Sequence, residues 1–401
     1  MFRFPKGFGH QVIALTRQYG SSSTPRATCL YDFHVAQGGK MVDFAGYLMP
    51  VQYEGLGIAA SHLHTRKHAS IFDVSHMLQT CIRGKDRIKF MESLCVADVQ
   101  GLKENHGTLS VFTNDQGGIL DDLIVTKTNQ DDLYLVTNAG CRETDVPLME
   151  SKVQDMQRQG LDVTLEYLEN RGLIALQGPE SARVLQSLCP QVTLSQIKFM
   201  TSCVTRVNGV DDVRITRCGY TGEDGFEISI QDSETAGLVE KLLSSEEGKV
   251  ELAGLGARDS LRLEAGLCLY GNDIDAKTTP VEAGLTWTIG KRRREEKGFP
   301  GAEVILNQIK TKPKIKRVGL ISSGPPARSH TAVIDPAQGT PVGEITSGCP
   351  SPSLEGHNVS MAYLPTTLSK IGTKVQLQIR KKTVSAEVVK MPFVPSNYYS
   401  S

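Results

Sequence analysis

A change of hydrophobic pattern near residue 316 constrains the fold of this 401-residue chain more than any other feature of the sequence. Beyond that point apolar residues recur at every second position, as in Val375, Leu377 and Ile379, and Gly- and Pro-containing turns separate the runs. Because neighbouring side chains of a strand point to opposite faces, this period indicates half-buried strands. The pattern predicts an all-β domain, a small barrel or a sandwich, over residues 316–401.

From about residue 40 to 280 the sequence instead mixes helical and strand periods, which favours an α+β architecture. Helices are predicted over 86–94 and 145–159, and a further helix is predicted to open at Gly178-Pro179-Glu180. The runs 123–128 and 133–137 read as a hairpin, and 213–217 and 226–230 read as a second strand pair. The loop of this second pair contains Gly219, Gly222 and Gly225, which allow a sharp turn and a close backbone approach.

The N-terminal segment has the composition of a mitochondrial presequence. Arg3, Lys6, Arg17 and Arg26 are interleaved with apolar residues and serines, and no acidic residue precedes Asp32. This amphipathic, acid-poor composition is typical of a matrix-targeting peptide. We therefore expect residues 1–28 to be a presequence, with a disordered basic tail as the alternative.

The overall composition excludes little but directs the search. Lys plus Arg and Asp plus Glu both number 44, so net charge gives no reason to expect nucleic acid or a membrane surface as partner. The nine cysteines form no CxxC pair, which favours free thiols over a disulfide framework and offers no zinc-type spacing. The usual dinucleotide, triphosphate and hydrolase motifs are absent from the sequence.

Two adjacent acids, Asp121 and Asp122, begin an otherwise apolar strand. Because side chains alternate along a strand, one carboxylate can stay in solvent while the other enters a cavity. A catalytic carboxylate is one interpretation, and an acid that caps the turn before the strand is the other.

Two further charged groups stand in apolar surroundings. Glu227 interrupts an apolar strand, and a ligand with two parallel N–H donors would match its carboxylate, although a solvated strand face remains open. Arg258 and Arg262 lie one turn apart on one helix face, where surface pairing with Asp259 and Glu264 is the alternative to ligand binding.

The remaining polar clusters are less specific. Among the four histidines at 62, 64, 68 and 76, His64 and His68 have a spacing that could ligate zinc, but no second cluster completes a site. We therefore expect ordinary surface or helix histidines and no metal. Residues 291–317 contain ten Lys or Arg against three Glu, a local net charge of +7 (10 − 3), which could steer an acidic partner or be a solvated face.

Taken together, the motifs resemble the aminomethyltransferase family, the T-proteins of the glycine cleavage system. The resemblance covers residues 29–399 and includes the segments around Asp122, Glu227 and Arg258. Its other motifs are Leu30-Tyr31-Asp32-Phe33-His34, Lys40-Met41-Val42-Asp43-Phe44-Ala45-Gly46, Phe72-Asp73-Val74-Ser75-His76-Met77, Leu269-Tyr270-Gly271-Asn272-Asp273, Gly343-Glu344-Ile345-Thr346-Ser347-Gly348 and Lys390-Met391-Pro392-Phe393. One departure is Tyr47, where the family usually has tryptophan, which concerns local packing more than chemistry.

The resemblance implies a fold and a set of site residues. It implies a three-domain cloverleaf with a central folate channel, two intertwined α+β domains over 29–315 and a barrel-like domain from 316. The family's essential aspartate corresponds to Asp122, its pterin-binding glutamate to Glu227 and its folate-binding arginine to Arg258. The other positions that the resemblance places around the folate are Met77, Asn138, Tyr220 and Tyr398.

The resemblance also implies the reaction. Members of the family take an aminomethylated lipoyl carrier, the H-protein, and tetrahydrofolate, and yield methylene-tetrahydrofolate, ammonia and dihydrolipoyl carrier. With the N-terminal segment it predicts a location in the mitochondrial matrix.

Two relatives of the same fold are the alternatives. A non-catalytic folate-binding protein of iron–sulfur cluster assembly would carry a KGCxxGQE-type motif, whereas this chain has Arg217-Cys218-Gly219-Tyr220-Thr221-Gly222-Glu223. The folate half of a flavin-dependent dimethylglycine or sarcosine dehydrogenase would follow a long flavin domain, whereas about 30 residues precede this region here.

Overall fold

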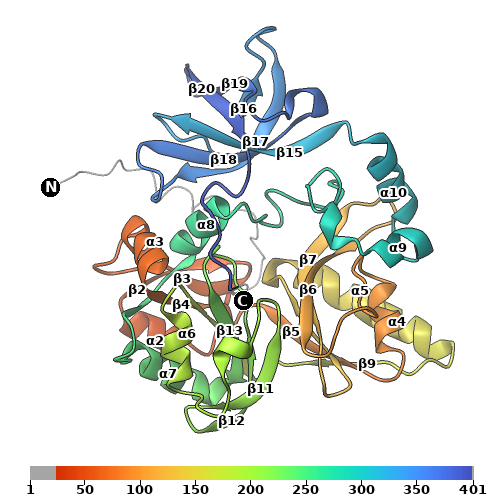
Figure 1. The fold of residues 1–401 in the computed structure, drawn as a ribbon, viewed down its shortest axis with the longest axis vertical. Coiled ribbons are helices and arrows are strands. Elements are labelled where there is room, and N and C mark those ends of the chain that lie inside the picture. The colour runs from red at the N-terminus through yellow and green to blue at the C-terminus, as the bar shows by residue number, and fades with distance from the viewer. Residues whose placement is uncertain (1–23, 400–401) are drawn as a thin grey trace.

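The computed structural model of the chain describes residues 24–399, which form three lobes around α8 (Leu255–Glu264) (Figure 1). Two lobes contain both helices and sheets and the third is a barrel, so the predicted α+β class with a C-terminal barrel is confirmed. Most of the predicted presequence, residues 1–23, lies outside the described residues. Thr28 and the strand β1 (Arg26–Ala27) belong to the fold, because Arg26 and Ala27 pair with Tyr47 and Leu48.

The first lobe contains a six-stranded sheet in the order β11-β12-β13-β10-β4-β14. Its strands are β4 (Ala69–Asp73), β10 (Arg171–Gln177), β11 (Ser202–Val207), β12 (Val210–Thr216), β13 (Gly225–Gln231) and β14 (Val250–Leu252). Helices α2 (Tyr31–Ala36), α6 (Ser181–Gln186) and α7 (Asp232–Leu243) belong to the same lobe, with the short turn η2 (Leu194–Gln196). Its core is apolar, as the alternating Ile174, Leu176, Phe226 and Ile228 require.

A smaller sheet and two helices complete this lobe. The sheet has the order β1-β3-β2, with β2 (Gly39–Phe44) and β3 (Tyr47–Tyr53). Helix α3 (Ile58–Lys67) packs against α8, and α8 also contacts β3 and two barrel strands. Because it touches both a sheet of the first lobe and the barrel, α8 links these two parts of the molecule.

The second lobe is inserted between β4 and β10. Its antiparallel sheet has the order β6-β7-β8-β5-β9. The elements are β5 (Leu78–Arg83), α4 (Arg87–Glu92), β6 (His106–Thr113), β7 (Ile119–Lys127), β8 (Leu133–Thr137), η1 (Ala139–Cys141), α5 (Arg142–Arg158) and β9 (Thr164–Tyr167). Leu123 pairs with Thr137, which confirms the predicted hairpin. This insertion makes the two α+β units intertwined, and the links between them bring residues from both units together.

The basic window joins the second lobe to the barrel. It contains α9 (Lys291–Glu296) and α10 (Ala302–Thr311), which follow the short turn η3 (Thr286–Thr288). Arg292 pairs with Glu92 and Asp98, and Arg293 is buried against the carbonyl of Glu92. The charges of these two arginines therefore help to hold α9 on the second lobe. The lysines of the same window, at 291, 297, 310, 312, 314 and 316, are exposed, so its role as a charged surface stays a prediction.

The third lobe is a closed barrel in the order β15-β18-β17-β16-β19-β20. Its elements are β15 (Ile315–Ser323), β16 (Ala332–Ile334), β17 (Pro341–Pro350), β18 (His357–Pro365), η4 (Thr366–Leu368), β19 (Lys374–Ile379) and β20 (Lys382–Val389). Val375 and Leu377 pack with Ala386 and Val388 in its interior. The alternation seen in the sequence thus fills a barrel and not a sandwich.

Glycine is required in the loop between β12 and β13. A Cβ at Gly219 would lie 1.9 Å from Gln177 Oε1, and one at Gly225 would lie 2.4 Å from the carbonyl oxygen of Leu176. Gly222 has a φ of +80°, which other residues rarely adopt. The close approach predicted from the sequence is confirmed, and it fixes the position of Tyr220 between these glycines.

Two further predictions concern the whole molecule. All nine cysteines lie in the described part of the chain and are free, as expected. No helix between residues 24 and 399 is both long and apolar enough to cross a membrane.

Candidate functional site

The seven predicted site residues are half-buried. They come from the first two lobes and from the C-terminal tail. Asp122 lies on β7, Glu227 on β13 and Arg258 on α8. Both sequence neighbours of each of these three residues are buried, whereas the three themselves keep some contact with solvent. Charged groups in such positions are deep but reachable, as a ligand-binding group must be.

Asn138 connects the acid pair. Its backbone N–H donates to Asp121 Oδ2 at 2.9 Å, and its side-chain Nδ2 donates to Asp121 Oδ1 at 2.8 Å. The same Nδ2 lies 3.0 Å from Asp122 Oδ1 and 2.9 Å from the carbonyl oxygen of Asp122. Asn138 therefore orients both carboxylates and lies beside Asp122, a contact that the sequence did not predict.

Asp122 is poised to exchange a proton near neutral pH. Burial raises its pKa to about 7, and the neighbouring charge of Asp121 acts in the same direction. The bond from Asn138 partly opposes these effects. A carboxyl group with a pKa near the working pH can both accept and donate a proton, which is the property of a general acid or base.

The expectation that the other carboxylate stays in solvent is wrong. Asp121 points away from Asp122, as alternation requires, but its exposed fraction is 0%. It faces Cys141 of η1 and Asp145 of α5. The sequence could not reveal this burial because α5 packs on the second face of the strand.

Glu227 and Arg258 lie within electrostatic reach of each other, but they are not in direct contact. Each shifts the pKa of the other, yet neither forms an ion pair within 4.0 Å among residues 24–399. Burial raises the pKa of Glu227, and burial lowers the pKa of Arg258. Arg258 Nη1 has no hydrogen-bond partner in the described part of the protein. Burying a charge with so few partners costs free energy. Such incompletely paired charges are typical of ligand-binding sites.

Tyr220 packs against Arg258 and is within electrostatic reach of Asp122. Its ring centroid is 4.8 Å from the guanidinium carbon of Arg258, and its hydroxyl donates to the carbonyl oxygen of Cys268. The charges of both Arg258 and Asp122 act on its pKa, which burial raises. Tyr220 therefore brings the Arg258–Glu227 side of the site and the Asp122 side together.

Arg262 is a structural residue, and its predicted surface pairing with Asp259 and Glu264 is only partly right. It is buried, and it pairs with Asp259 at 2.8 Å and with Asp273 at 2.6 Å. Glu264 lies on another side of α8 and pairs with Arg66 at 3.0 Å. The two arginines that looked alike in the sequence thus have different roles.

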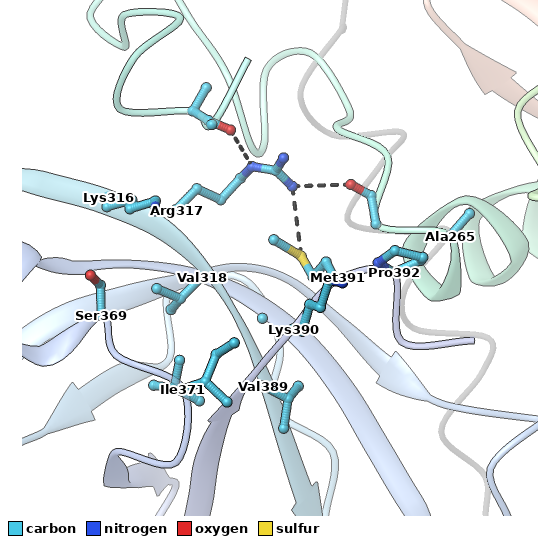
Figure 2. Close-up of a pocket in the computed structure, with 15 residues that line it drawn as sticks. Ala265, Lys316, Arg317, Val318, Ser369, Ile371, Val389, Lys390, Met391 and Pro392 are labelled. Atoms are coloured by element: carbon cyan, nitrogen blue, oxygen red, sulfur yellow. Dashed lines mark hydrogen bonds between the residues drawn. The ribbon is translucent and has the colours of Figure 1, made fainter. Parts of the chain in front are cut away.

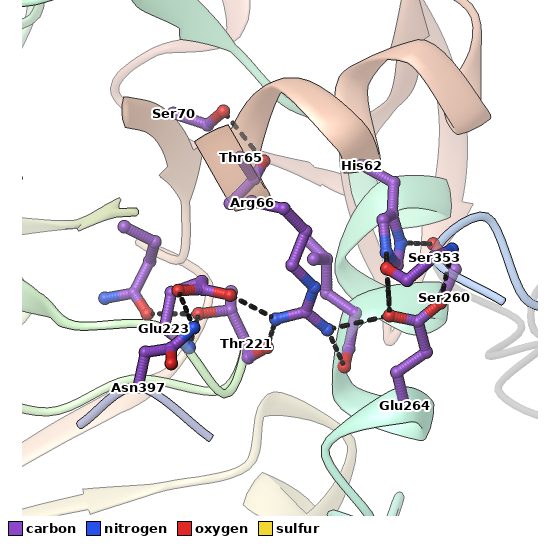
Figure 3. A network of polar contacts seen from close by, with 12 residues as sticks. His62, Thr65, Arg66, Ser70, Thr221, Glu223, Ser260, Glu264, Ser353 and Asn397 are labelled. Carbon is purple, nitrogen blue, oxygen red and sulfur yellow. Dashed lines mark hydrogen bonds and ion pairs between the residues drawn. The ribbon is translucent and has the colours of Figure 1, made fainter. Parts of the chain in front are cut away.

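A buried polar network holds the C-terminal tail in place (Figure 3). Arg66 on α3 donates to Glu223 at 2.9 Å and to Glu264 at 3.0 Å. Asn397 then donates from Nδ2 to Glu223 Oε2 at 2.9 Å. Tyr398, the next residue, stacks on Phe199 with ring centroids 4.3 Å apart. The network explains how a residue at the end of the chain comes to lie on the first lobe.

Met77 lies in the link between β4 and β5, next to His76. His76 is buried, with its ring 5.7 Å from that of Phe44, and its Nδ1 has no partner in the described region. Burial lowers the pKa of His76 to about 4, helped by the charge of Arg258, so the ring is neutral at neutral pH. The sequence reasoning assigned His76 to ordinary histidines and missed that it lies within reach of Arg258.

His62 is a helix histidine on α3, one of the two expected positions, and it does not lie at the surface. It is buried, with Nδ1 2.8 Å from Ser260 Oγ and Nε2 2.9 Å from Glu264 Oε2. No group of three or more His, Cys, Asp or Glu residues suited to a metal ion occurs among the described residues. His62 therefore belongs to the network around Glu264.

A cavity of about 370 Å³ lies elsewhere, between the end of α8 and the barrel (Figure 2). It is lined by Lys316, Arg317 and Met391 among others, and by none of the seven predicted site residues. Arg317 donates to the carbonyl oxygens of Ala283 at 2.7 Å and Gly266 at 3.1 Å. Because Arg317 ties the barrel to the neighbouring loops, the cavity reads as a gap at this junction.

The free polar groups of the site would match a planar ligand that carries paired N–H donors and an acidic group. Glu227 offers two carboxylate oxygens to paired N–H donors, and the unpaired Arg258 Nη1 offers a donor to an acidic group. Tyr220 and Tyr398 supply rings for contact with a planar heterocycle. No metal is required for any of these contacts.

Comparison with known proteins identifies the family of the chain. The family model for the GCVT N-terminal domain matches residues 30–293, and that for the glycine cleavage T-protein C-terminal barrel domain matches residues 316–395. The protein named aminomethyltransferase, mitochondrial, of Homo sapiens is 56% identical over 375 residues, covering 94% of this chain and 91% of the human one. The protein of the same name from Solanum tuberosum is 52% identical over 383 residues, covering 96% and 93% of the two chains.

A solved structure gives the same result at the level of the fold. The crystal structure of glycine cleavage system aminomethyltransferase T from Bartonella henselae is 39% identical, has a TM-score of 0.86, and covers 94% of this chain and 100% of its own. These matches do not favour the non-catalytic relative considered as an alternative. The chain therefore belongs to the glycine cleavage T-protein family, the aminomethyltransferases of the glycine cleavage system.

Proposed function

We propose that this protein transfers the methylene carbon of an aminomethyl group, carried on the lipoyl arm of the H-protein, to tetrahydrofolate. The products are methylene-tetrahydrofolate, ammonia and dihydrolipoyl carrier. One observation carries the proposal. Three ionisable side chains, those of Asp122, Arg258 and Glu227, lie within electrostatic reach of Tyr220 or of each other, and none of the three forms an ion pair among residues 24–399. Tetrahydrofolate, when bound, supplies the nitrogen nucleophile that accepts the carbon.

Glu227, Arg258 and Tyr220 have binding roles in this proposal. The carboxylate of Glu227 accepts from the paired N–H donors of the pterin, and Arg258 donates to an acidic group of the folate. Glu227 and Arg258 are incompletely paired in the free protein, which costs free energy. The ligand supplies the missing partners, and the recovered free energy favours the bound state. Met77, Tyr220 and Tyr398 contribute the apolar and aromatic contacts that fix the orientation.

Asp122 has the catalytic role. Its carboxylate stabilises the positive charge that develops on the transferred carbon as ammonia leaves, and it can accept or return a proton. Because burial raises its pKa to about 7, both its protonated and its ionised form are accessible near neutral pH. Asn138 holds this carboxylate in one orientation through the bond to Oδ1.

We further propose that the protein acts in the mitochondrial matrix after removal of an N-terminal presequence. The acid-free, Arg- and Ser-bearing start of the chain supports this, as do relatives that are named mitochondrial.

Ammonia release from aminomethylated H-protein, measured with and without tetrahydrofolate, tests the proposed reaction. We expect release to be fast only when both are present, with methylene-tetrahydrofolate formed in equal amount. Release that is equally fast without folate would contradict the folate-dependent transfer.

A further inference from the structure

Asp145, on the first turn of α5, is a buried acid without a matching charge. Its exposed fraction is 0%, and neither of its oxygens has a hydrogen bond of ordinary geometry in the described part of the chain, although the Thr137 hydroxyl is close enough to act on its pKa. No Lys, Arg or His nitrogen lies within 4.0 Å of it among those residues either. The positive end of a helix contributes only about 0.3–1 kcal/mol, too little to hold a bare carboxylate in the interior. Asp145 is therefore neutral, which means that it carries a proton.

Asp121 is the charged neighbour that can accept the proton of Asp145. Hydrogen bonding between the two side chains acts to raise the pKa of Asp145 and to lower that of Asp121, although burial raises the pKa of Asp121. Both oxygens of Asp121 already accept from Asn138, Oδ2 from the backbone N–H and Oδ1 from Nδ2. Acceptance at both oxygens favours the anion, because the hydroxyl oxygen of a protonated acid is a much weaker acceptor than a carboxylate oxygen. The bond therefore runs from Asp145 O–H to Asp121.

Asn138 connects the Asp145–Asp121 pair to Asp122. Its Nδ2 faces Asp121 Oδ1 at 2.8 Å and Asp122 Oδ1 at 3.0 Å. Since an amide can turn over and exchange its oxygen for its NH₂ group, something must fix its orientation. The two bonds to Asp121 do so, and they leave an N–H to point at Asp122.

We propose that Asp145 stays protonated through the neutral range, that it donates to Asp121, and that this pair is the positioning device that holds Asn138 against Asp122. The inference rests on the proposed catalytic role of Asp122. It makes Asp121 and Asp145 positioning residues, since neither reaches the half-buried side of the strand where Asp122 lies.

The charges around the pair agree with this assignment. The groups that face Asp145 are Asp121 and Asp122 of β7, Cys141 of η1 and Tyr270 of the segment after α8, and none of them is a cation. Burial and the charge of Asp121 raise the pKa of Asp145 to about 10. The anionic Asp121 also raises the pKa of Asp122. The pair thus sets both the orientation and the proton affinity of Asp122.

The pairing can be tested without any assay of activity. Because the pKa of Asp145 is raised on folding, its contribution to stability is full below its unfolded value of about 4 and is lost as pH rises toward 10. Denaturant midpoints of wild type should therefore fall between pH 5.5 and 9. Asp145→Asn, whose amide still donates to Asp121 but cannot ionise, should lose much of this slope. Asp155→Asn, on the same helix but at an exposed position, should keep the wild-type slope.

Infrared difference spectra provide a second measurement. Wild type and Asp155→Asn should show the carbonyl stretch of a protonated carboxylic acid at pH 8.5, where Asp122 is largely ionised. Asp145→Asn should lack that band. An Asp145→Asn variant with the wild-type slope and the wild-type band would overturn the proposal, whatever its activity.

Kinetics then test the positioning role. Asp145→Asn should keep kcat within about threefold of wild type, because the donor to Asp121 remains. Asp121→Asn turns one acceptor into a donor opposite Asn138, so kcat should fall about tenfold or more while the KM for tetrahydrofolate changes little. The pH below which the kcat/KM of Asp121→Asn declines should also be lower than in wild type, because the negative charge that raises the pKa of Asp122 is gone.

The possible failures are distinguishable. A folded Asp121→Asn variant with wild-type kcat and pH profile would overturn the positioning role. If wild type itself releases no ammonia in a folate-dependent way, the proposed function fails, and the stability slopes and the infrared band still decide the pairing of Asp145 with Asp121.

Discussion

The guanidinium carbon of Arg258 lies 4.8 Å from the centre of the Tyr220 ring, and no carboxylate among residues 24–399 lies within 4.0 Å of Arg258. An aromatic face attracts a cation but compensates only part of the cost of burying it. The protein therefore holds a positive charge in its interior with an incomplete set of partners. This arrangement favours a ligand that brings a negative group, and it predicts opposite effects on binding and on stability.

Arg258→Met should weaken tetrahydrofolate binding by about tenfold or more, since a charge-assisted hydrogen bond is worth about 1.5–3 kcal/mol. The same change should leave the free energy of unfolding unchanged or raise it, because a buried and poorly paired charge is removed. Calorimetric titration and denaturant unfolding measure the two effects. Arg206→Met, at an exposed surface pair, is the control for both.

Glu227→Gln should weaken folate binding by a similar factor without unfolding the protein, because one carboxylate oxygen is replaced by a donor that opposes the pterin N–H groups. The measurement is again a calorimetric titration. Unchanged affinity in both Glu227→Gln and Arg258→Met would place these residues outside the folate site.

Asp122→Asn keeps the shape of the side chain and removes its charge. Folate should still bind, but turnover should fall at least about a hundredfold, roughly 2.7 kcal/mol of barrier, the lower end of what a positioned acid or base contributes. Ammonia release at saturating substrates, with circular dichroism as the check on folding, measures this. A variant that turns over at nearly the wild-type rate would move the chemistry to another group.

The raised pKa of Asp122 predicts that activity and stability change in opposite directions with pH. If the carboxylate is the active form, kcat/KM should fall about tenfold per pH unit below pH 7, and Asp122→Asn should lose this limb. The stability that Asp122 contributes is full below its unfolded pKa of about 4 and is lost as pH rises through 7. Asp122→Asn should therefore be more stable than wild type at pH 8, which denaturant unfolding would show.

The network of Glu264 should show the opposite pH dependence. Hydrogen bonds from His62, Ser351 and Ser353 lower the pKa of Glu264 to about 2 despite its burial. Its contribution to stability is present above the unfolded pKa of about 4.5 and is lost as pH falls toward 2. Glu264→Gln leaves Arg66 partly unpaired and should cost about 3–5 kcal/mol at pH 7, with a smaller loss at pH 3. Glu251→Gln, half exposed, should cost much less.

The N-terminus of the protein isolated from mitochondria should lie at or shortly before Arg26. Arg26 and Ala27 pair with β3, and Thr28 Oγ1 donates to Asp73 Oδ2 at 2.7 Å, so cleavage beyond Thr28 would remove part of the fold. N-terminal sequencing measures this position. Recovery of intact Met1 from the matrix would contradict the presequence.

The sequence by itself determined the local structure and the family. The alternation of Val375, Leu377 and Ile379 predicted the strands of a barrel or a sandwich. The hairpin predicted over 123–128 and 133–137 is present, although its first strand begins at Ile119. Both follow from periods of two or of about 3.6 residues, which are properties of neighbours along the chain. The order of the motifs predicted the family, and the comparisons confirmed it.

Only the tertiary structure decided which side chains are paired with which. His62 and Glu264 are 202 residues apart in the chain, and Arg292 and Asp98 are 194 apart, yet each pair is in contact. The sequence pattern allowed Asp121 to face solvent, but in the structure α5 covers Asp121 and brings Asp145 next to it. The physical reason is that the sequence around a charged residue does not show which distant residue will pair with it. Burial and pairing depend on which distant segments the packing of the lobes brings together.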